Sequence, residues 1–208
     1  MEVDARHLQV EAIPVQTVAV GTEPPQPKMP LDLKRYYEYF IERAQTLREQ
    51  LEKLDKEGWK VIFPEGEQGA RINLEMRRIY LGSDSDNAAA LTHELGHAIA
   101  GLDDSEIPKE YGACVDRLLL FEGTAILNNI IIREEILAKG GCDIGIMGAT
   151  FKYLENPFMN IYNDFKNGTT KRKEAEKRLG ELLRKQKIST GEETYEQYYG
   201  EFCKTHCS

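Results

Sequence analysis

Apolar side chains recur at alternating intervals of four and three residues in the stretch that follows residue 30. The set is Leu33, Tyr37, Phe40, Ala44, Leu47, Leu51 and Leu54. This spacing predicts one apolar face of a single long helix. Asp32 is the expected N-cap, and Gly58 is the expected end. The apolar face is interpreted as packing against the rest of the domain, and a coiled-coil partner surface is the alternative.

Three short segments with β-branched and aromatic residues come next. They are "WKVIF" (59–63), "ARINLEM" (70–76) and "RRIYLG" (77–82), and the first two are separated by the turn sequence "PEGEQG". The pattern predicts a small sheet or meander. The third segment is the expected edge strand, where an extended peptide could add by β-augmentation.

The rest of the chain favours helices. One is expected from Ala88 to Ala100, stopped by Gly101, with N-cap candidates in "SDSDN" at 83–87. A second runs from Tyr111 to about Leu137, and polar helices follow. The prediction is an α+β fold in which a small β-sheet and the helix at 88–100 pack on a mainly helical part.

The first 30 residues differ from this pattern. They are rich in proline and lack a helical period, so we expect an extended leader or linker, with a short strand around Val15 to Val20. Residues 31–208 are then expected to form one domain. The start is acidic without an apolar segment and does not predict a Sec signal peptide, so synthesis in a reducing compartment is expected.

The candidate chemistry lies in "HELGH". On a helix His93 and His97 project from one face, and two neutral imidazoles at that spacing can bind one zinc ion. Glu94 lies beside the first ligand and suits a general base acting on water. Gly96 is interpreted as leaving room beside the metal. Two core or surface histidines and a solvated glutamate are the alternative.

A catalytic zinc site needs a third protein ligand. Glu122 is preferred because it sits in an otherwise apolar helix, where a buried carboxylate needs a partner or a metal. Gly123 beside it would permit close approach of another helix. Asp103, six residues after His97, is the alternative ligand. A salt bridge from Glu122 to Arg117 or Lys109 is the non-metal alternative.

Other side chains are candidates for supporting roles. Asn129 and Arg133 fall on the helical face of Glu122 and could orient the ligands. A hydroxyl that stabilises the transition state is expected from Tyr153, Tyr162 or the tyrosines near the C-terminus. Each of these residues also has a plain structural interpretation, as a helix surface or an inter-helix hydrogen bond.

Net charge and hydropathy limit the classes of binding partner, and the spacing of the cysteines bears on their chemical state. The net charge of −8 over 208 residues argues against a general nucleic-acid binder. The sequence has no apolar run of membrane length. The basic segment near residues 169–187 is interpreted as a solvated face, with membrane or nucleic-acid contact as the alternative. Free thiols are expected for all four cysteines, and a metal clip of Cys203, Cys207 and His206 is the alternative.

Two stretches carry a resemblance to a known family. "ALTHELGHAIAG", followed by "FEGTAILNNIIIREE", resembles the gluzincin-type zincin metallopeptidases. More narrowly, residues 59–137 are similar to metallopeptidase domains of bacterial secreted effectors and polymorphic toxins. The resemblance implies a zincin-like fold with the active-site cleft between a sheet-bearing part and a helical part. It implies Zn²⁺ held by His93, His97 and Glu122, with Glu94 as general base.

The resemblance also implies a biological setting. The expected protein is made in the bacterial cytoplasm, delivered by a specialised secretion system, and hydrolyses peptide bonds of a protein or peptide substrate. A cognate immunity protein would be its partner if the target is a sister cell. Two other interpretations stay open: an intracellular regulatory peptidase that acts on one partner protein, and a non-catalytic helical interaction module.

Overall fold

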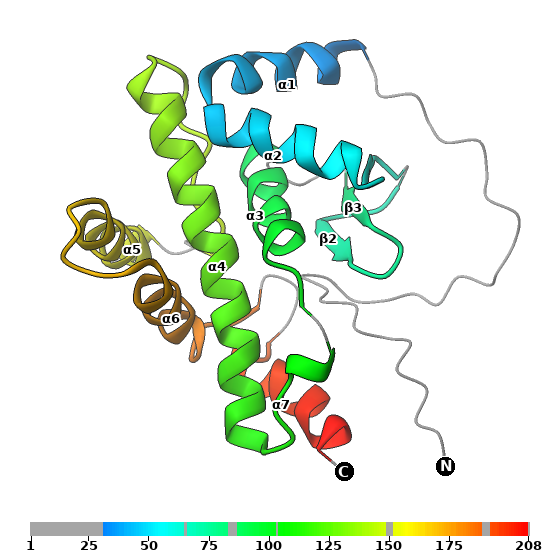
Figure 1. The fold of residues 1–208 in the computed structure, drawn as a ribbon, viewed down its shortest axis with the longest axis vertical. Helices are drawn as coiled ribbons and strands as arrows, with labels where there is room; N and C mark the ends of the chain where they lie inside the picture. The colour runs from blue at the N-terminus through cyan, green and yellow to red at the C-terminus, as the bar shows by residue number, and fades with distance from the viewer. Residues whose placement is uncertain are drawn as a thin grey trace, which may run out of the picture.

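The computed structural model describes residues 31–64, 66–82, 87–102, 104–148, 152–188 and 192–207. The leader at 1–30, with its expected strand, lies outside this part of the chain, as do Asp103 and the cap candidates at 83–86. The elements are α1 (Leu31–Arg43), α2 (Gln45–Lys56), β1 (Lys60–Ile62), β2 (Ala70–Asn73), β3 (Arg78–Leu81), α3 (Asn87–Ala100), a 3₁₀ turn η1 (Asp104–Glu106), α4 (Tyr111–Ala138), α5 (Lys152–Lys166), α6 (Arg172–Leu183) and α7 (Tyr195–His206). Figure 1 shows the long helix α4 running through the molecule, with the sheet on one side and α5 and α6 on the other. The predicted α+β class is confirmed.

The first helical stretch is two helices, so the prediction of one long helix is wrong. Ala44 has an extended backbone, with φ −117° and ψ 113°, and it separates α1 from α2. The carboxylate of Glu135, on α4, accepts hydrogen bonds from the backbone N–H of Thr46 at 2.9 Å and from its hydroxyl at 2.5 Å. A distant side chain therefore caps the start of α2. The apolar period continues across the break because both helices face the same core.

The sheet has the strand order β1-β3-β2, so the predicted sheet is confirmed but the meander is not. β2 pairs antiparallel with β3, and Ile72 lies opposite Ile79. β1 pairs parallel with the other side of β3, where Val61 lies opposite Ile79. β3 is therefore the central strand. The expectation that "RRIYLG" forms a free edge is wrong, because β1 occupies that side; the two edges are β1 and β2.

Helix α3 packs between the sheet and α4, and its predicted extent is confirmed. It contacts α2, β2, β3 and α4, and Leu91, Leu95 and Ala98 are buried in the core. Gly96 lies where α3 meets α4: a Cβ there would come within 2.6 Å of the Ala125 Cα. The interpretation of Gly96 as room beside a metal is thus wrong. The missing side chain lets two helix backbones approach each other.

Helix α4 has the predicted extent and begins with a side-chain cap. Glu110 accepts hydrogen bonds from the backbone N–H groups of Gly112 and Ala113. Gly123 does face another helix, but the helix is α6. A Cβ on Gly123 would overlap the carbonyl oxygen of Glu176, and one on Gly180 would overlap that of Leu119. The predicted close approach of another helix at Gly123 is therefore confirmed, and that helix is α6.

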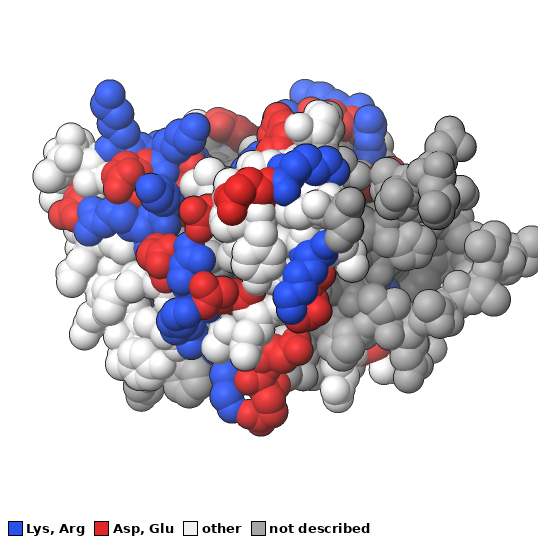
Figure 2. All heavy atoms as spheres, turned by 90° about the horizontal axis from the view of Figure 1, so that it is seen from below, with Lys and Arg blue, Asp and Glu red and all other residues white. Residues whose placement is uncertain are grey.

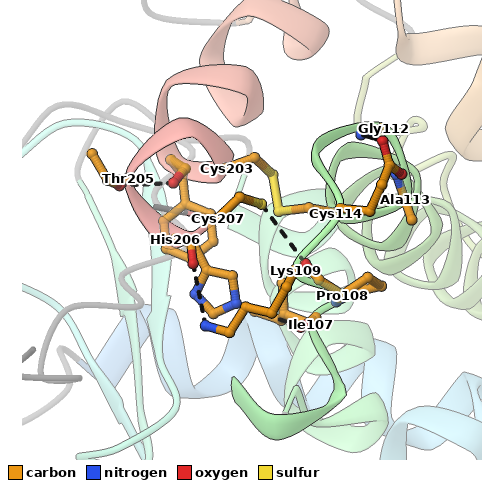
Figure 3. The surroundings of a disulfide bond; sticks show 12 residues. Ile107, Pro108, Lys109, Gly112, Ala113, Cys114, Cys203, Thr205, His206 and Cys207 are labelled. Carbon is orange, nitrogen blue, oxygen red and sulfur yellow. Dashed lines mark hydrogen bonds between the residues drawn. A yellow bond between two sulfur atoms is a disulfide. The ribbon is translucent and has the colours of Figure 1, made fainter.

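Helix α7 is joined to α4 by a disulfide between Cys114 and Cys203, drawn in Figure 3. The prediction of free thiols is wrong for this pair and holds for Cys142 and Cys207. The metal-clip alternative also fails. Cys203 is in the disulfide, the thiol of Cys207 lies 3.9 Å from the carbonyl oxygen of Pro108, and His206 stacks on Phe202. Sequence spacing could not indicate a pair that is 89 residues apart.

Charges on the outer surface are mixed rather than segregated. Figure 2 shows basic and acidic side chains interspersed on the face that it presents. Arg184 is one such cation, and it pairs with Asp116 at 2.5 Å and with Glu181 at 2.7 Å. In the part of the chain that the structure describes, none of the helices has the length and apolar character needed to cross a membrane.

Candidate metal centre

Two of the candidate ligands are presented by α3. His93 and His97 lie one turn apart, and their ring centroids are 4.8 Å apart. Both side chains are buried, and the His97 ring also packs 4.3 Å from the ring of Phe121 on α4. The core packing of α3 therefore fixes which way the two imidazoles point, before any ion is considered.

The third candidate comes from α4. The Glu122 Oε2 atom lies 3.4 Å from His93 Nε2, and its Oε1 atom lies 3.6 Å from His97 Nε2. One ligand atom from each of the three residues lies within 4.8 Å of the others. The salt-bridge alternative for Glu122 is not what the structure contains. Arg117 pairs with Glu106, and Lys109 donates to the carbonyl oxygen of His206.

These three side chains fit a small divalent cation. Ligand atoms that each lie about 2.1 Å from one tetrahedral ion are roughly 3.4 Å apart, which matches the two histidine–glutamate distances. The Nδ1 atoms of both histidines are buried and lack a hydrogen-bond partner among the described residues. The Nε2 atoms, which face Glu122, are thus the ones placed to ligate. A buried His93, His97 and Glu122 group that could hold a metal ion is present.

Burial and mutual charge set the pKa values in this cluster. Burial alone would raise the pKa of Glu122, but His97, His93 and the Tyr199 hydroxyl outweigh it and hold that pKa at about 2. Burial lowers the pKa of His97 to about 3, despite the charge of Glu122. For His93, the hydrogen bond and charge of Glu122 overcome burial and raise the pKa. The neighbours of Glu122 therefore favour its carboxylate form, and burial disfavours the charged form of His97.

Glu94 lies next to this group and is also buried. One of its carboxylate oxygens, Oε1, has no hydrogen-bond partner among the described residues. Burial, together with the charge of Glu122, raises its pKa to about 7, and the charge of His93 opposes that shift. Two carboxylates buried together without a cation are costly, and a divalent ion would balance them.

The last helix brings two tyrosines to the cluster. The Tyr199 hydroxyl donates a short hydrogen bond to Glu122 Oε1. Tyr195 lies one turn before Tyr199, with its ring centroid 6.2 Å from that of Tyr199. Burial, with the charges of Glu122 and Glu94, raises the pKa of Tyr195. Of the named alternatives, Tyr153 is exposed and its hydroxyl bonds Gln186, and Tyr162 packs in a different cluster with α5 and α6. The choice among tyrosines therefore falls on α7.

The residues predicted to orient the ligands have other partners. The Asn129 amide donates to the Thr92 hydroxyl at 2.8 Å, and its side-chain oxygen accepts from the Met147 N–H. Arg133 pairs with Asp143 at 2.5 Å and with Glu155 at 3.2 Å. Asn129 holds α3 at Thr92, and both residues hold the loop after α4 in place. Of the two alternatives, the plain structural interpretation fits these contacts, and Tyr199 is the partner of Glu122 that the sequence did not indicate.

A cleft of about 780 Å³ lies elsewhere, against α3, α4 and α6. Its lining includes Gly96, Leu120, Thr124 and Asn128. Glu122 is two residues from both Leu120 and Thr124, so it points to the opposite side of α4. None of the three candidate ligands lines this cleft. It is not the cleft between the sheet and the helices that the resemblance implies.

Comparison of the chain with protein-family models, with curated proteins and with solved structures finds no match.

Proposed function

We propose that this protein is a zinc-dependent metallopeptidase whose metal is held by His93, His97 and Glu122. The observation that carries the proposal is the buried convergence of those three side chains from α3 and α4. Three protein ligands leave a tetrahedral ion one open position, which is the arrangement of catalytic rather than structural zinc sites. Zinc bound there would activate water and polarise a carbonyl group.

The roles of the protein groups follow from their positions. Glu94 would accept a proton from the attacking water and pass it to the departing amine, since its buried oxygen Oε1 has no other partner. Tyr195, whose ring lies 6.2 Å from that of Tyr199, is the candidate donor to the developing oxyanion. The substrate class is a protein or peptide, as the resemblance to zincins implies.

A peptide-library digest tests this proposal. The zinc-loaded chain and its Glu94→Gln variant are incubated with a complex peptide mixture, and new termini are identified by mass spectrometry. Cleavage by the wild type, lost in a Glu94→Gln variant that keeps its zinc, is the expected result. Zinc binding without any cleavage would contradict the proposed peptidase activity and favour a structural role for the metal.

The second candidate is a structural metal in a non-catalytic module. One observation favours it: His93, His97 and Glu122 are only 6%, 2% and 5% exposed. A catalytic site must admit its substrate, and these side chains are nearly closed to solvent among the described residues. The open fourth position argues the other way, and the digest separates the two.

The proposal extends to a bacterial effector or toxin delivered by a specialised secretion system, with a cognate immunity protein as partner. The support is the resemblance of residues 59–137 to such domains. Inducible expression in bacteria tests it. Growth arrest that Glu94→Ala relieves is expected. Normal growth with an active peptidase would favour the intracellular regulatory peptidase.

A further inference from the structure

Helix α7 meets α4 at three levels, and one of them is the metal centre. Tyr199 and Cys203 are four residues apart and lie on one face of α7. Tyr199 donates to Glu122, and Cys203 is bonded to Cys114, about two turns before Glu122 on α4. Between them, Gly200 lets the Tyr111 hydroxyl approach, since a Cβ there would lie 2.4 Å from that oxygen.

Among the described residues, the Tyr199 hydroxyl supplies the hydrogen bond that supports a candidate ligand, Glu122, from outside the three-residue cluster. Metal-bound histidines usually donate their second ring nitrogen to a carboxylate or carbonyl. Here the Nδ1 atoms of His93 and His97 lack such a partner among the described residues, and Glu122 alone is supported, by a buried hydroxyl. The donor occupies Oε1 and leaves Oε2, which lies 3.4 Å from His93 Nε2, free to ligate.

We propose that Tyr199 is a positioning residue for the metal ligand Glu122 and that the Cys114–Cys203 disulfide holds it there, so that reducing the disulfide weakens metal binding. The inference rests on the proposed metal site. The reductant is a dithiol: the disulfide takes up two electrons and two protons and gives two thiols, while the dithiol closes to its own disulfide. No atom of the metal centre takes part in this step.

Reduction should loosen α7 without releasing it. Tyr199 and Cys203 belong to a buried cluster with Ile107, Cys114, Val115, Leu118 and Leu119, and these contacts remain after the disulfide is cut. Figure 3 shows that the carboxyl-terminal end of α7 also lies against the segment around Ile107, Pro108 and Lys109. Tyr199 would then spend less time bonded to Glu122, and the carboxylate would be less well oriented for a metal.

The first test compares Tyr199→Phe with Tyr153→Phe, which removes the same atom at an exposed position on α5. Zinc affinity is measured by competition with a chelator, and Co²⁺ loading reports the ligand geometry through its visible absorption. We expect Tyr199→Phe to raise Kd by about 10- to 100-fold and to change the Co²⁺ spectrum. Tyr153→Phe should change neither. A Tyr199→Phe affinity within twofold of Tyr153→Phe would overturn the positioning role.

The second test addresses the disulfide and does not depend on the folding of Tyr199→Phe. Cys114→Ser/Cys203→Ser is compared with Cys142→Ser/Cys207→Ser, which removes the two free thiols. We expect the first pair to raise the zinc Kd at least threefold and the second to leave it unchanged. Adding Tyr199→Phe to Cys114→Ser/Cys203→Ser should raise the zinc Kd by a smaller factor than adding it to the wild type. The reason is that the disulfide and Tyr199 act through the same contact with Glu122.

The outcomes also separate this inference from the proposed function. A wild-type chain that binds no zinc would defeat the proposed function and this inference together. Tight zinc binding that is indifferent to Tyr199→Phe and to loss of the disulfide would overturn this inference and leave the metal site standing. Alkylation of the unreduced chain in denaturant, followed by mass spectrometry, must count two reactive cysteines; four would overturn the disulfide.

Discussion

Helices α3 and α7 both bring side chains to Glu122, but they are held in different ways. α3 is packed between the sheet and α4, and Gly96 brings its backbone close to that of α4 at Ala125. α7 is held by a disulfide, a small apolar cluster, one glycine contact and the Tyr199 hydrogen bond. The ligands on α3 are therefore set by the core. The support from α7 depends on a few separable contacts.

The difference bears on what each helix can do. A helix fixed by many core contacts cannot move without unfolding, so it suits residues whose geometry must be constant. A helix fixed by one covalent bond and a small apolar cluster can loosen while the rest of the domain stays folded. The two candidate histidine ligands lie on the first kind of element, and the proposed positioning of Glu122 by Tyr199 depends on the second.

The largest expected effect comes from changing Glu122, the α4 residue that side chains of both α3 and α7 contact. Glu122→Gln keeps the shape of the side chain but not its charge, so the histidines lose their anionic co-ligand. Metal per chain, measured by elemental analysis after zinc loading and desalting, should fall from about one to near zero. Glu57→Gln, an exposed glutamate at the end of α2, is the control and should retain its zinc. Retention of zinc by Glu122→Gln would exclude the three-ligand site.

Next in size is the loss of the disulfide. A cross-link that closes a loop of 89 residues restricts the unfolded chain, and its removal should lower the free energy of unfolding by about 2–5 kcal/mol. Urea denaturation of Cys114→Ser/Cys203→Ser against Cys142→Ser/Cys207→Ser measures this difference. Unfolding of the first pair should begin at α7. Equal midpoints for the two variants would show that α7 does not depend on its cross-link.

Gly96→Ala tests the close contact of α3 with α4. The new Cβ would meet the Ala125 backbone, which cannot yield as a side chain can, so we expect a loss of about 2 kcal/mol in stability. The control is Gly112→Ala, where the Cβ would meet only the flexible end of Glu110 at 3.3 Å. Thermal unfolding measures both, and a Tm for Gly96→Ala equal to that of the control would show that α3 is not held by this contact.

The smallest expected effect on stability concerns Asp143, in the loop after α4. The hydrogen bond from Arg133 lowers the pKa of Asp143, so the pair stabilises the fold above the ordinary pKa of an aspartate and less as the pH falls through the lowered value. Asp143 is half exposed, and Asp143→Asn should cost about 1 kcal/mol or less at pH 7. The difference in urea midpoint from the wild type should begin to shrink below about pH 4 and should disappear below the lowered pKa of Asp143. A constant difference down to pH 2 would contradict the ion pair.

The sequence predicted most accurately those features that depend on residues within a single helix. The i, i+4 histidines with Glu94 and the limits of α3 and α4 are local patterns, and the structure has them as expected. Glu122 was identifiable because a carboxylate in an apolar helix needs a partner. The features that the sequence did not predict depend on contacts between distant residues. They are the capping of α2 by Glu135, the pairing of β1 with β3, and the disulfide between Cys114 and Cys203.

Tyr199 shows the same limit at the site. It is one of three tyrosines within five residues in "YEQYY", and only the packing of α7 on α4 decides which of them reaches Glu122. Asn129 and Arg133 were expected at the ligands from their helical face alone. They extend instead toward Thr92 and Asp143, because that end of α4 faces the start of α3 and the loop after α4.

The central claim is that one metal ion is bound by two imidazoles and one carboxylate. X-ray absorption at the zinc edge of the loaded native chain tests it most directly. The account predicts a first shell of nitrogen and oxygen at about 2.0–2.1 Å, with imidazole back-scattering from two histidines and no sulfur. A sulfur shell at about 2.3 Å, or a chain that retains no zinc to measure, would contradict it.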